Sequence, residues 1–419
     1  MRRKIFISIC CTVVFCFAWT FASAEPPQFP QNATFTTLIT TPRALEGLTG
    51  DGRGNLYTGG SGATPCPIWK INIAKPSLVP VGFVPTPPPP QTLTCGFSGI
   101  TFNDLGDLFV ADGTAGRIYT FTPNAGNPPN ATVFASGVPG TNGVAFDRDG
   151  NLWTGDGTTG QGRVWKITGA GANCTAASPI NCEEVFRIQP MANEVNLVSG
   201  VGGVGRDVRD LPPGTITVTP TSRNAANTAG SQPLVANGVA FNHQGDMFVI
   251  DTARGALWKV EFDRQGNLKS PIGCDTTFTD NTLCLSNVFV AHPILEGGDG
   301  IALDVAGNIW VDANERNAVA VVTKDGRVEE VFRNPVNSAN LRNSADTAKG
   351  NTQILEFPTS PFLSRKVFCT SMSDGDRRDN SPRSAGEIDA SGNTVGKNLG
   401  KISCMDQDLN IPGLPLPVR

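Results

Sequence analysis

The chain has 419 residues, of which 39 % are hydrophobic and 17 % charged, so it can bury a sizeable core and is not disordered as a whole. Its 47 Gly and 32 Pro residues exceed the usual share and argue against long helices. Without the N-terminal segment described next, 30 basic residues face 37 acidic ones, and this net charge of −7 excludes an electrostatic case for binding nucleic acid. The only two histidines, His243 and His292, are too few for a multi-histidine metal centre.

The N-terminal segment has the pattern of an export signal. Arg2, Arg3 and Lys4 precede an apolar run, and Ala22-Ser23-Ala24 supplies the small-x-small pattern of a cleavage site. We therefore predict a signal peptide over 1–24 and a protein that is secreted or periplasmic. No later stretch is apolar for the roughly 20 residues that a membrane helix needs, so we expect no membrane span.

The cysteines that remain after cleavage are even in number, and an oxidising compartment favours disulfides among them. They fall as close neighbours separated by long gaps. The spacing favours four local bridges: Cys66 with Cys95, Cys174 with Cys182, Cys274 with Cys284, and Cys369 with Cys404.

The organisation of the chain is a repeat. Five segments share an apolar strand, a polar turn closing on Gly-Asn or Gly-Asp, and a second strand rich in aromatic and β-branched residues. Their turn glycines are Gly54, Gly106, Gly150, Gly245 and Gly307. Further strands follow each hairpin, and four strands per unit are typical of a propeller blade. The pattern predicts an all-β protein.

The five hairpins leave one blade to be found. The 95-residue step from Gly150 to Gly245 is also longer than the other steps, so it contains either a further blade or an insertion. We place a disulfide-containing insertion at 169–232, between blades 3 and 4, and a degenerate sixth blade beginning at Asn351. The strand-like segment 34–40 has no blade of its own and is predicted to complete the last blade, which removes the open sheet edges. The propeller then spans 25–410, and the proline-rich tail 411–419 should lie extended on the surface.

One column of the repeat carries the candidate chemistry. The residue before the first glycine of each unit precedes the innermost strand and should face the central channel. This column contains Glu46, Ser98, Asn142, Asn237 and Asp299, and Thr352 is the candidate for the sixth blade. Two carboxylates and two amide oxygens suit a hard divalent cation, Ca²⁺ first and otherwise Mg²⁺ or Mn²⁺. Taken singly, Asn142 and Asn237 also fit a turn, since Asn-Gly is a strong turn signal.

The Glu, Asn, Asn, Asp order resembles the senescence-marker-protein/gluconolactonase family and the related paraoxonase and diisopropyl-fluorophosphatase propellers. Asp299-Gly-Ile-Ala-Leu-Asp-Val-Ala-Gly-Asn-Ile-Trp-Val is the closest stretch. The resemblance implies a six-bladed propeller in which Glu46, Asn142, Asn237 and Asp299 bind the metal. It also implies that Asp299 is the catalytic base or nucleophile in the hydrolysis of a small lactone or ester. Gly140-Thr141 before Asn142 departs from the sugar-binding pattern of gluconolactonases.

Two other readings remain open. The first is a non-catalytic propeller like the NHL-repeat proteins, which would bind a protein or glycan and hold any calcium structurally. The second is a strictosidine-synthase-like propeller, which shares the fold without this ligand set.

Overall fold

The computed structural model describes residues 29–30, 33–63, 65–85, 94–157, 159, 161–189, 236–295, 297–314, 317–333, 355, 357–373, 387–388, 394–395 and 400–417. The predicted signal peptide 1–24, Thr352 and residues 190–232 of the predicted insertion lie outside these ranges. No helix among the described residues is long and apolar enough to cross a membrane.

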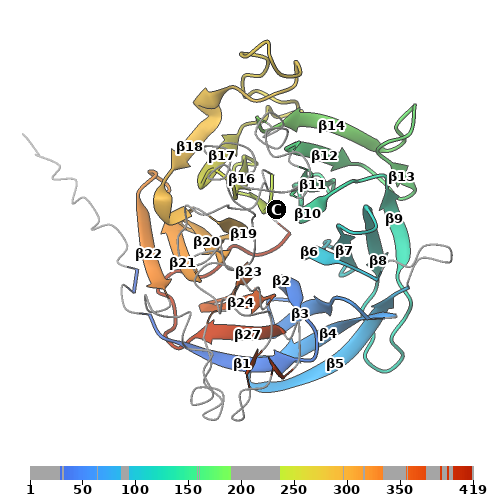
Figure 1. The fold of residues 1–419 in the computed structure, drawn as a ribbon, viewed down its shortest axis with the longest axis vertical. Helices are drawn as coiled ribbons and strands as arrows, with labels where there is room; N and C mark the ends of the chain where they lie inside the picture. The colour runs from blue at the N-terminus through green and yellow to red at the C-terminus, as the bar shows by residue number, and fades with distance from the viewer. Residues whose placement is uncertain are drawn as a thin grey trace, which may run out of the picture.

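The described residues form six sheets arranged around a central axis, which is a six-bladed propeller (Figure 1). Each sheet contains four antiparallel strands, and that of blade 2 has a fifth strand at its outer edge. Blade 1 contains β2 (Leu45–Gly50), β3 (Asn55–Gly60), β4 (Cys66–Asn72) and β5 (Lys75–Val84). Blade 2 contains β6 (Phe97–Phe102), β7 (Leu108–Asp112), β8 (Arg117–Phe121) and β9 (Thr132–Ser136). Blade 3 contains β10 (Thr141–Phe146), β11 (Leu152–Asp156), β12 (Arg163–Ile167) and β14 (Cys182–Arg187).

The remaining three blades follow the same order from the axis outward. Blade 4 contains β15 (Val239–Phe241), β16 (Met247–Asp251), β17 (Ala256–Val260) and β18 (Val288–Ala291), with short 3₁₀ turns η2 (Leu285–Asn287) and η3 (Pro293–Leu295) beside it. Blade 5 contains β19 (Gly298–Leu303), β20 (Ile309–Ala313), β21 (Ala318–Val322) and β22 (Val328–Arg333). Blade 6 contains β23 (Pro358–Ser364), β24 (Val367–Met372), β27 (Gly400–Met405) and β1 (Phe35–Thr41). A small hairpin, β25 (Glu387–Ile388) with β26 (Thr394–Val395), stands apart.

The ring is closed by the N-terminal strand, as predicted. Strand β1 pairs antiparallel with β27, with Phe35 opposite Met405. Residues from opposite ends of the chain therefore share one sheet, and the disulfide between Cys369 and Cys404 joins β24 to β27 in that sheet. The other three predicted bridges are also present, between Cys66 and Cys95, Cys174 and Cys182, and Cys274 and Cys284.

The hairpin turns explain the spacing of the repeat. All five turn glycines have positive φ angles, between 82° for Gly150 and 89° for Gly245, a conformation that favours glycine. An Asp or Asn three residues before each glycine accepts hydrogen bonds from backbone amides two and four residues further on, as Asp147 does from Asp149 and Asn151. The equivalent residues in the other blades are Asp51, Asn103, Asn242 and Asp304.

Aromatic side chains on the first and second strands pack between neighbouring blades. Trp153 of blade 3 lies 5.9 Å from the ring of Phe241 in blade 4, and Trp310 of blade 5 lies 5.2 Å from Phe368 in blade 6. Both tryptophans are almost fully buried. Large buried rings of this kind stabilise the contact between sheets.

The predicted insertion begins later than 169. Residues Cys182–Arg187 form the outermost strand of blade 3, and Ala172–Asn173 (β13) adds a parallel strand to the edge of blade 2. The disulfide between Cys174 and Cys182 therefore belongs to the blades. The sequence hides this strand because its exposed Glu183 and the cysteine at its start do not alternate as a buried strand would.

The sixth blade and the tail also differ from prediction. The innermost strand of blade 6 starts at Pro358 and not at Asn351. The tail is not a surface segment throughout, since Leu414 is 6 % exposed and its backbone amide donates to the carbonyl of Leu303 at 2.8 Å. Figure 1 shows the C-terminus at the centre of the ring. Because the channel is apolar at this end, as described below, Leu414 lies in a buried environment that the proline spacing alone does not reveal, whereas Leu416 is 45 % exposed.

Candidate functional site

The column predicted from the repeat lies at the start of the innermost strands. Glu46, Ser98, Asn142 and Asp299 are each the second residue of such a strand. Asn237 precedes β15 by two residues, and its backbone amide donates to the carbonyl of Ile250 in the neighbouring strand. Asn142 is therefore a strand residue, and the turn interpretation of its Asn-Gly pair is wrong. Asn237 lies just before its strand, where its backbone is already paired with β16.

The glycine after each column residue shows that the column closes into a ring. A Cβ atom added to Gly47 would lie 2.2 Å from the backbone oxygen of Ser98 in the next blade. The corresponding distances are 2.5 Å from Gly99 to Asn142, 2.5 Å from Gly143 to Asn237, 2.5 Å from Gly238 to Asp299 and 2.4 Å from Gly300 to Thr359. Only glycine allows this close backbone approach. Successive blades thus bring their column residues together around the axis.

Thr359 is the sixth member of this polar ring. Its hydroxyl donates to the backbone oxygen of Glu46 at 2.7 Å and so joins blade 6 to blade 1. Thr352, the sequence candidate, lies outside the described residues. The sequence misses Thr359 because Ser360 replaces the glycine and Pro358 precedes it, which removes the Gly-based signature of the other blades. We call Glu46, Ser98, Asn142, Asn237, Asp299 and Thr359 the polar ring.

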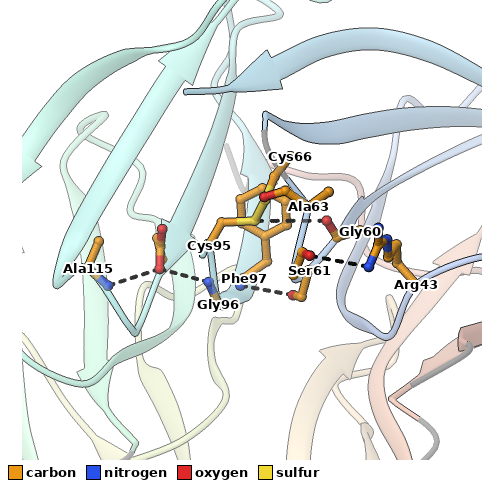
Figure 2. Close-up of a disulfide and its surroundings, with 11 residues drawn as sticks. Arg43, Gly60, Ser61, Ala63, Cys66, Cys95, Gly96, Phe97 and Ala115 are labelled. Carbon is orange, nitrogen blue, oxygen red and sulfur yellow. Dashed lines mark hydrogen bonds between the residues drawn. A yellow bond between two sulfur atoms is a disulfide. The ribbon is translucent and has the colours of Figure 1, made fainter. Parts of the chain in front are cut away.

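The connection between blades 1 and 2 shows how one ring position is held. The disulfide between Cys66 and Cys95 lies directly before Phe97, whose backbone amide donates to the hydroxyl of Ser61 at 3.1 Å (Figure 2). Strand β6 starts at Phe97, so this cross-link fixes where Ser98 enters the ring. The Ser98 hydroxyl donates to the backbone oxygen of Thr141 in blade 3 at 2.8 Å.

The polar ring is largely removed from solvent. Asn142 is 7 %, Asn237 1 % and Asp299 3 % exposed, whereas Glu46 is half-buried. The Asn237 side-chain amide donates to Thr252 Oγ1 at 3.0 Å, and the Thr252 hydroxyl donates to the carbonyl of Gly298 at 2.6 Å. This chain fixes the amide nitrogen against blade 4, so Asn237 can present its Oδ1 oxygen elsewhere.

Asp299 is positioned by a neighbouring amide. The side-chain nitrogen of Asn314 donates to Asp299 Oδ2 at 2.8 Å, and both residues are buried. A hydrogen bond donated to a carboxylate stabilises its ionised form. Asn314 therefore both orients Asp299 and supports its negative charge.

A second carboxyl beside Asp299 was not singled out from the sequence. Asp312 on β20 is fully buried, and its Oδ2 accepts a hydrogen bond from the Thr370 hydroxyl of blade 6 at 2.5 Å. Burial, and to a lesser extent the charge of Asp299, raises the pKa of Asp312 well above its usual range. Asp312 therefore resists ionisation in the folded protein.

A signal for Asp312 is present in the repeat. Blades 2, 3 and 4 carry an aspartate six residues after the turn glycine, namely Asp112, Asp156 and Asp251. These cap the following turns; Asp112 Oδ1 accepts hydrogen bonds from the backbone amides of Gly96 and Ala115. Blade 5 has Ala313 at that position and its aspartate one residue earlier. Since side chains alternate along a strand, this shift turns Asp312 to the other face of β20, against blade 6.

The donor set fits a hard cation by its chemistry. Among the residues that the structure describes, no group of three or more His, Cys, Asp and Glu side chains is placed to hold a metal ion. A cation at the polar ring would therefore need the amide oxygens of Asn142 and Asn237 as well as the carboxylates of Glu46 and Asp299. Carboxylate and amide oxygens are the ligands that Ca²⁺ and Mg²⁺ prefer.

Neither histidine belongs to this site. His243 lies in the turn between β15 and β16, which is the opposite end of the innermost strand from Asn237. His292 Nδ1 accepts a hydrogen bond from the backbone amide of Ile294 at 3.1 Å and so has a structural role in the η3 turn. The polar ring thus contains no imidazole base.

Comparison with known proteins supports the expected family. A family model described as the SMP-30/gluconolactonase/LRE-like region matches residues 201–341, which confirms the sequence resemblance over about a third of the chain. This match begins at residue 201, so it includes part of the predicted insertion 169–232. A comparison with curated proteins found no match.

Two solved structures illustrate the fold. A luciferin-regenerating enzyme is 13 % identical, covers 91 % of this chain and 97 % of its own, and has a TM-score of 0.50. An aldose sugar dehydrogenase from Streptomyces coelicolor, solved with PQQ bound, is 12 % identical, covers 90 % of this chain and 99 % of its own, and has a TM-score of 0.51. At these identities the likenesses show the propeller fold alone.

Proposed function

We propose that this senescence-marker-protein/gluconolactonase-like propeller is an exported, calcium-dependent hydrolase of a small lactone or ester. The observation that carries the proposal is the close backbone approach of neighbouring innermost strands, which begin with two carboxylate and two amide residues in four blades. The SMP-30/gluconolactonase-like sequence region supports it. The N-terminal signal pattern supports export.

The residues of the polar ring have two roles, cation binding and attack on the substrate. Glu46, Asn142, Asn237 and Asp299 would hold the cation, and a cation bound there would supply Lewis acidity to the substrate carbonyl. Asp299, oriented by Asn314, serves as the base for an attacking water or attacks the carbonyl itself. Its burial beside Asn237 keeps bulk water away from the reacting group.

The half-buried position of Glu46 supports an approach of substrate from the polar-ring end of the channel. The other end is bordered by the C-terminal tail. The substrate carbonyl would therefore meet Asp299 from the side on which the innermost strands begin.

Hydrolysis of aryl esters and lactones by the exported protein, measured with Ca²⁺ and again with chelator, tests the proposal. The Asp299→Asn variant removes the basic oxygen pair but keeps the shape, so kcat should fall by about 100-fold or more. The control Asp263→Asn changes an exposed turn carboxylate and should leave kcat unchanged. Turnover that survives both chelation and Asp299→Asn would exclude this function.

A non-catalytic binding propeller that holds a structural cation is the alternative function. The observation that separates the two is the pattern over variants. In the hydrolase, Asp299→Asn lowers kcat more than it lowers thermal stability in saturating Ca²⁺. In a binding propeller no substrate of this class is turned over by any variant, while chelation still lowers stability.

A further inference from the structure

A cleft of about 430 Å³ lies between blades 4 and 5, at the end of the molecule where the turns of the innermost hairpins lie. Blade 4 contributes the turn that carries His243 and the rings of Phe248 and Phe289, and blade 5 contributes its turns at 303–307 and at Lys324. The volume is within the range of small-molecule sites. The wall includes none of the six polar-ring residues, so the cleft is separate from the candidate cation site.

Part of the wall is apolar and reachable from solvent. The rings of Phe248 and Phe289 in blade 4 pack edge to face, with their centroids 5.7 Å apart. Phe248 is buried, whereas Phe289 is only half-buried, so the ring of Phe289 is the one that a molecule in the cleft can contact. Blade 5 contributes Val305, which is 43 % exposed. Both blades therefore offer apolar surface to a ligand.

The carboxylates in the wall are already bound within the protein. Asp246 forms an ion pair with the Lys259 ammonium at 3.1 Å, and Lys259 also pairs with Glu261 at 2.9 Å. Asp304 is buried and accepts four hydrogen bonds within its own blade. These acids and Lys259 are therefore occupied by one another or by the turns that they cap.

Two basic side chains in the wall have no such partner. Lys324 is exposed in the tight turn after β21, and His243 is exposed in the turn between β15 and β16. Among the described residues, neither side chain has a hydrogen bond or an ion pair with another. Asp325 beside Lys324 lies outside the wall, and its carboxylate accepts a hydrogen bond from the Thr323 hydroxyl. Because a lysine can only donate and a histidine has at least one donor, these two groups favour a negatively charged ligand.

We propose that this cleft binds the anion of a small organic acid that carries a hydrocarbon chain or ring. The carboxylate of the ligand pairs with Lys324 and accepts a hydrogen bond from His243, and the hydrocarbon body lies against Phe289 and Val305. Since an exposed ion pair contributes little by itself, apolar contact supplies most of the affinity and the charge supplies selectivity. The site needs no cation and does not depend on the proposed hydrolase function.

Two probes of equal size that differ in charge test the site in the intact protein. Phenylpropanoate and its amide are titrated by calorimetry into protein that has been dialysed against EDTA and then against buffer, so that a failure of the cation site does not affect the result. We expect phenylpropanoate to bind and the amide to bind about 2- to 5-fold more weakly. Absence of phenylpropanoate binding at millimolar concentration, or equal affinity for the two probes, would overturn the proposal.

Variants then locate the binding. Lys324→Met removes the charge but keeps an apolar side chain, and should remove most of the difference between the two probes. The matched control Lys75→Met changes an exposed turn lysine of blade 1 and should keep that difference. Ala306→Phe fills the cleft from an exposed turn position of blade 5 and should abolish binding of both probes. An unchanged difference in Lys324→Met, or unchanged binding in Ala306→Phe, would contradict the assignment.

Discussion

The two ends of the central channel are built from the same six innermost strands but have opposite chemistry. At one end the strands contribute Glu46, Asp299 and the other members of the polar ring, and two residues further along they contribute aliphatic side chains. A glycine separates the two positions in five of the six blades. A shift of two residues along one strand therefore separates a candidate ionic site from an apolar cavity.

The glycines lie between the polar end and the apolar end of the channel in five of the six blades. Because each lies against the backbone oxygen of the next blade, it lets neighbouring innermost strands approach closely between the polar and apolar positions. Changes at the glycines should therefore damage both ends, whereas changes at either end should leave the other intact. The following variants test this separation.

The largest effect on stability is expected at a glycine. In Gly143→Ala the new Cβ would lie 2.5 Å from the backbone oxygen of Asn237, a clash that no side-chain rotation can relieve, so the free energy of unfolding should fall by about 3 kcal/mol. Denaturant unfolding measures this change. The control Gly126→Ala, where the nearest atom would be 3.6 Å away, should be nearly neutral. Equal stability of the two variants would show that the strands do not meet as described.

A smaller effect is expected from the tail. Leu414→Ala removes a buried side chain at the edge of the core and should lower the free energy of unfolding by about 2 kcal/mol. The same variant should bind Ca²⁺ as the native protein does, because Leu414 lies at the apolar end. A loss of Ca²⁺ affinity in Leu414→Ala would break the proposed independence of the two ends.

The pH dependence of stability tests the buried carboxyl beside the polar ring. Because the pKa of Asp312 is raised in the folded protein, its contribution to stability is complete below the unfolded pKa of about 3.9 and is lost as pH rises through the folded pKa. Asp312→Asn cannot ionise, so its stability relative to the native protein should rise with pH, by about 1.4 kcal/mol for each unit by which the pKa is raised. Urea unfolding in EDTA from pH 3 upward measures the difference, and parallel pH curves would contradict the assignment.

The fold was largely predictable because each blade repeats a local signal. The positions of the turn glycines located blades 1 to 5, and the positive φ angles of these residues explain why glycine stands there. The strand-like segment 34–40 correctly predicted how the ring closes. Cysteines close in sequence correctly predicted the disulfides. Blade 6 was misplaced because Thr359-Ser360 lacks the glycine on which the pattern depends.

The site was predictable only where it follows the repeat. The column placed Glu46, Ser98, Asn142, Asn237 and Asp299 correctly at the start of the innermost strands. Asp312 and Asn314 act through contacts between neighbouring strands and blades, which no spacing along the chain reveals. The buried tail depends in the same way on the apolar end of the channel, which exists only after the ring has formed.

Calorimetric titration of Ca²⁺ into the native protein and into the Glu46→Gln, Asp299→Asn double variant tests the central claim most directly, because both substitutions keep the shape of the ring and remove its charge. We expect the native protein to bind one Ca²⁺ per chain at the ring and the double variant to lose this binding, while Asp263→Asn retains it. Equal Ca²⁺ affinity in the native protein and the double variant would contradict the account, since the cation would then be held elsewhere.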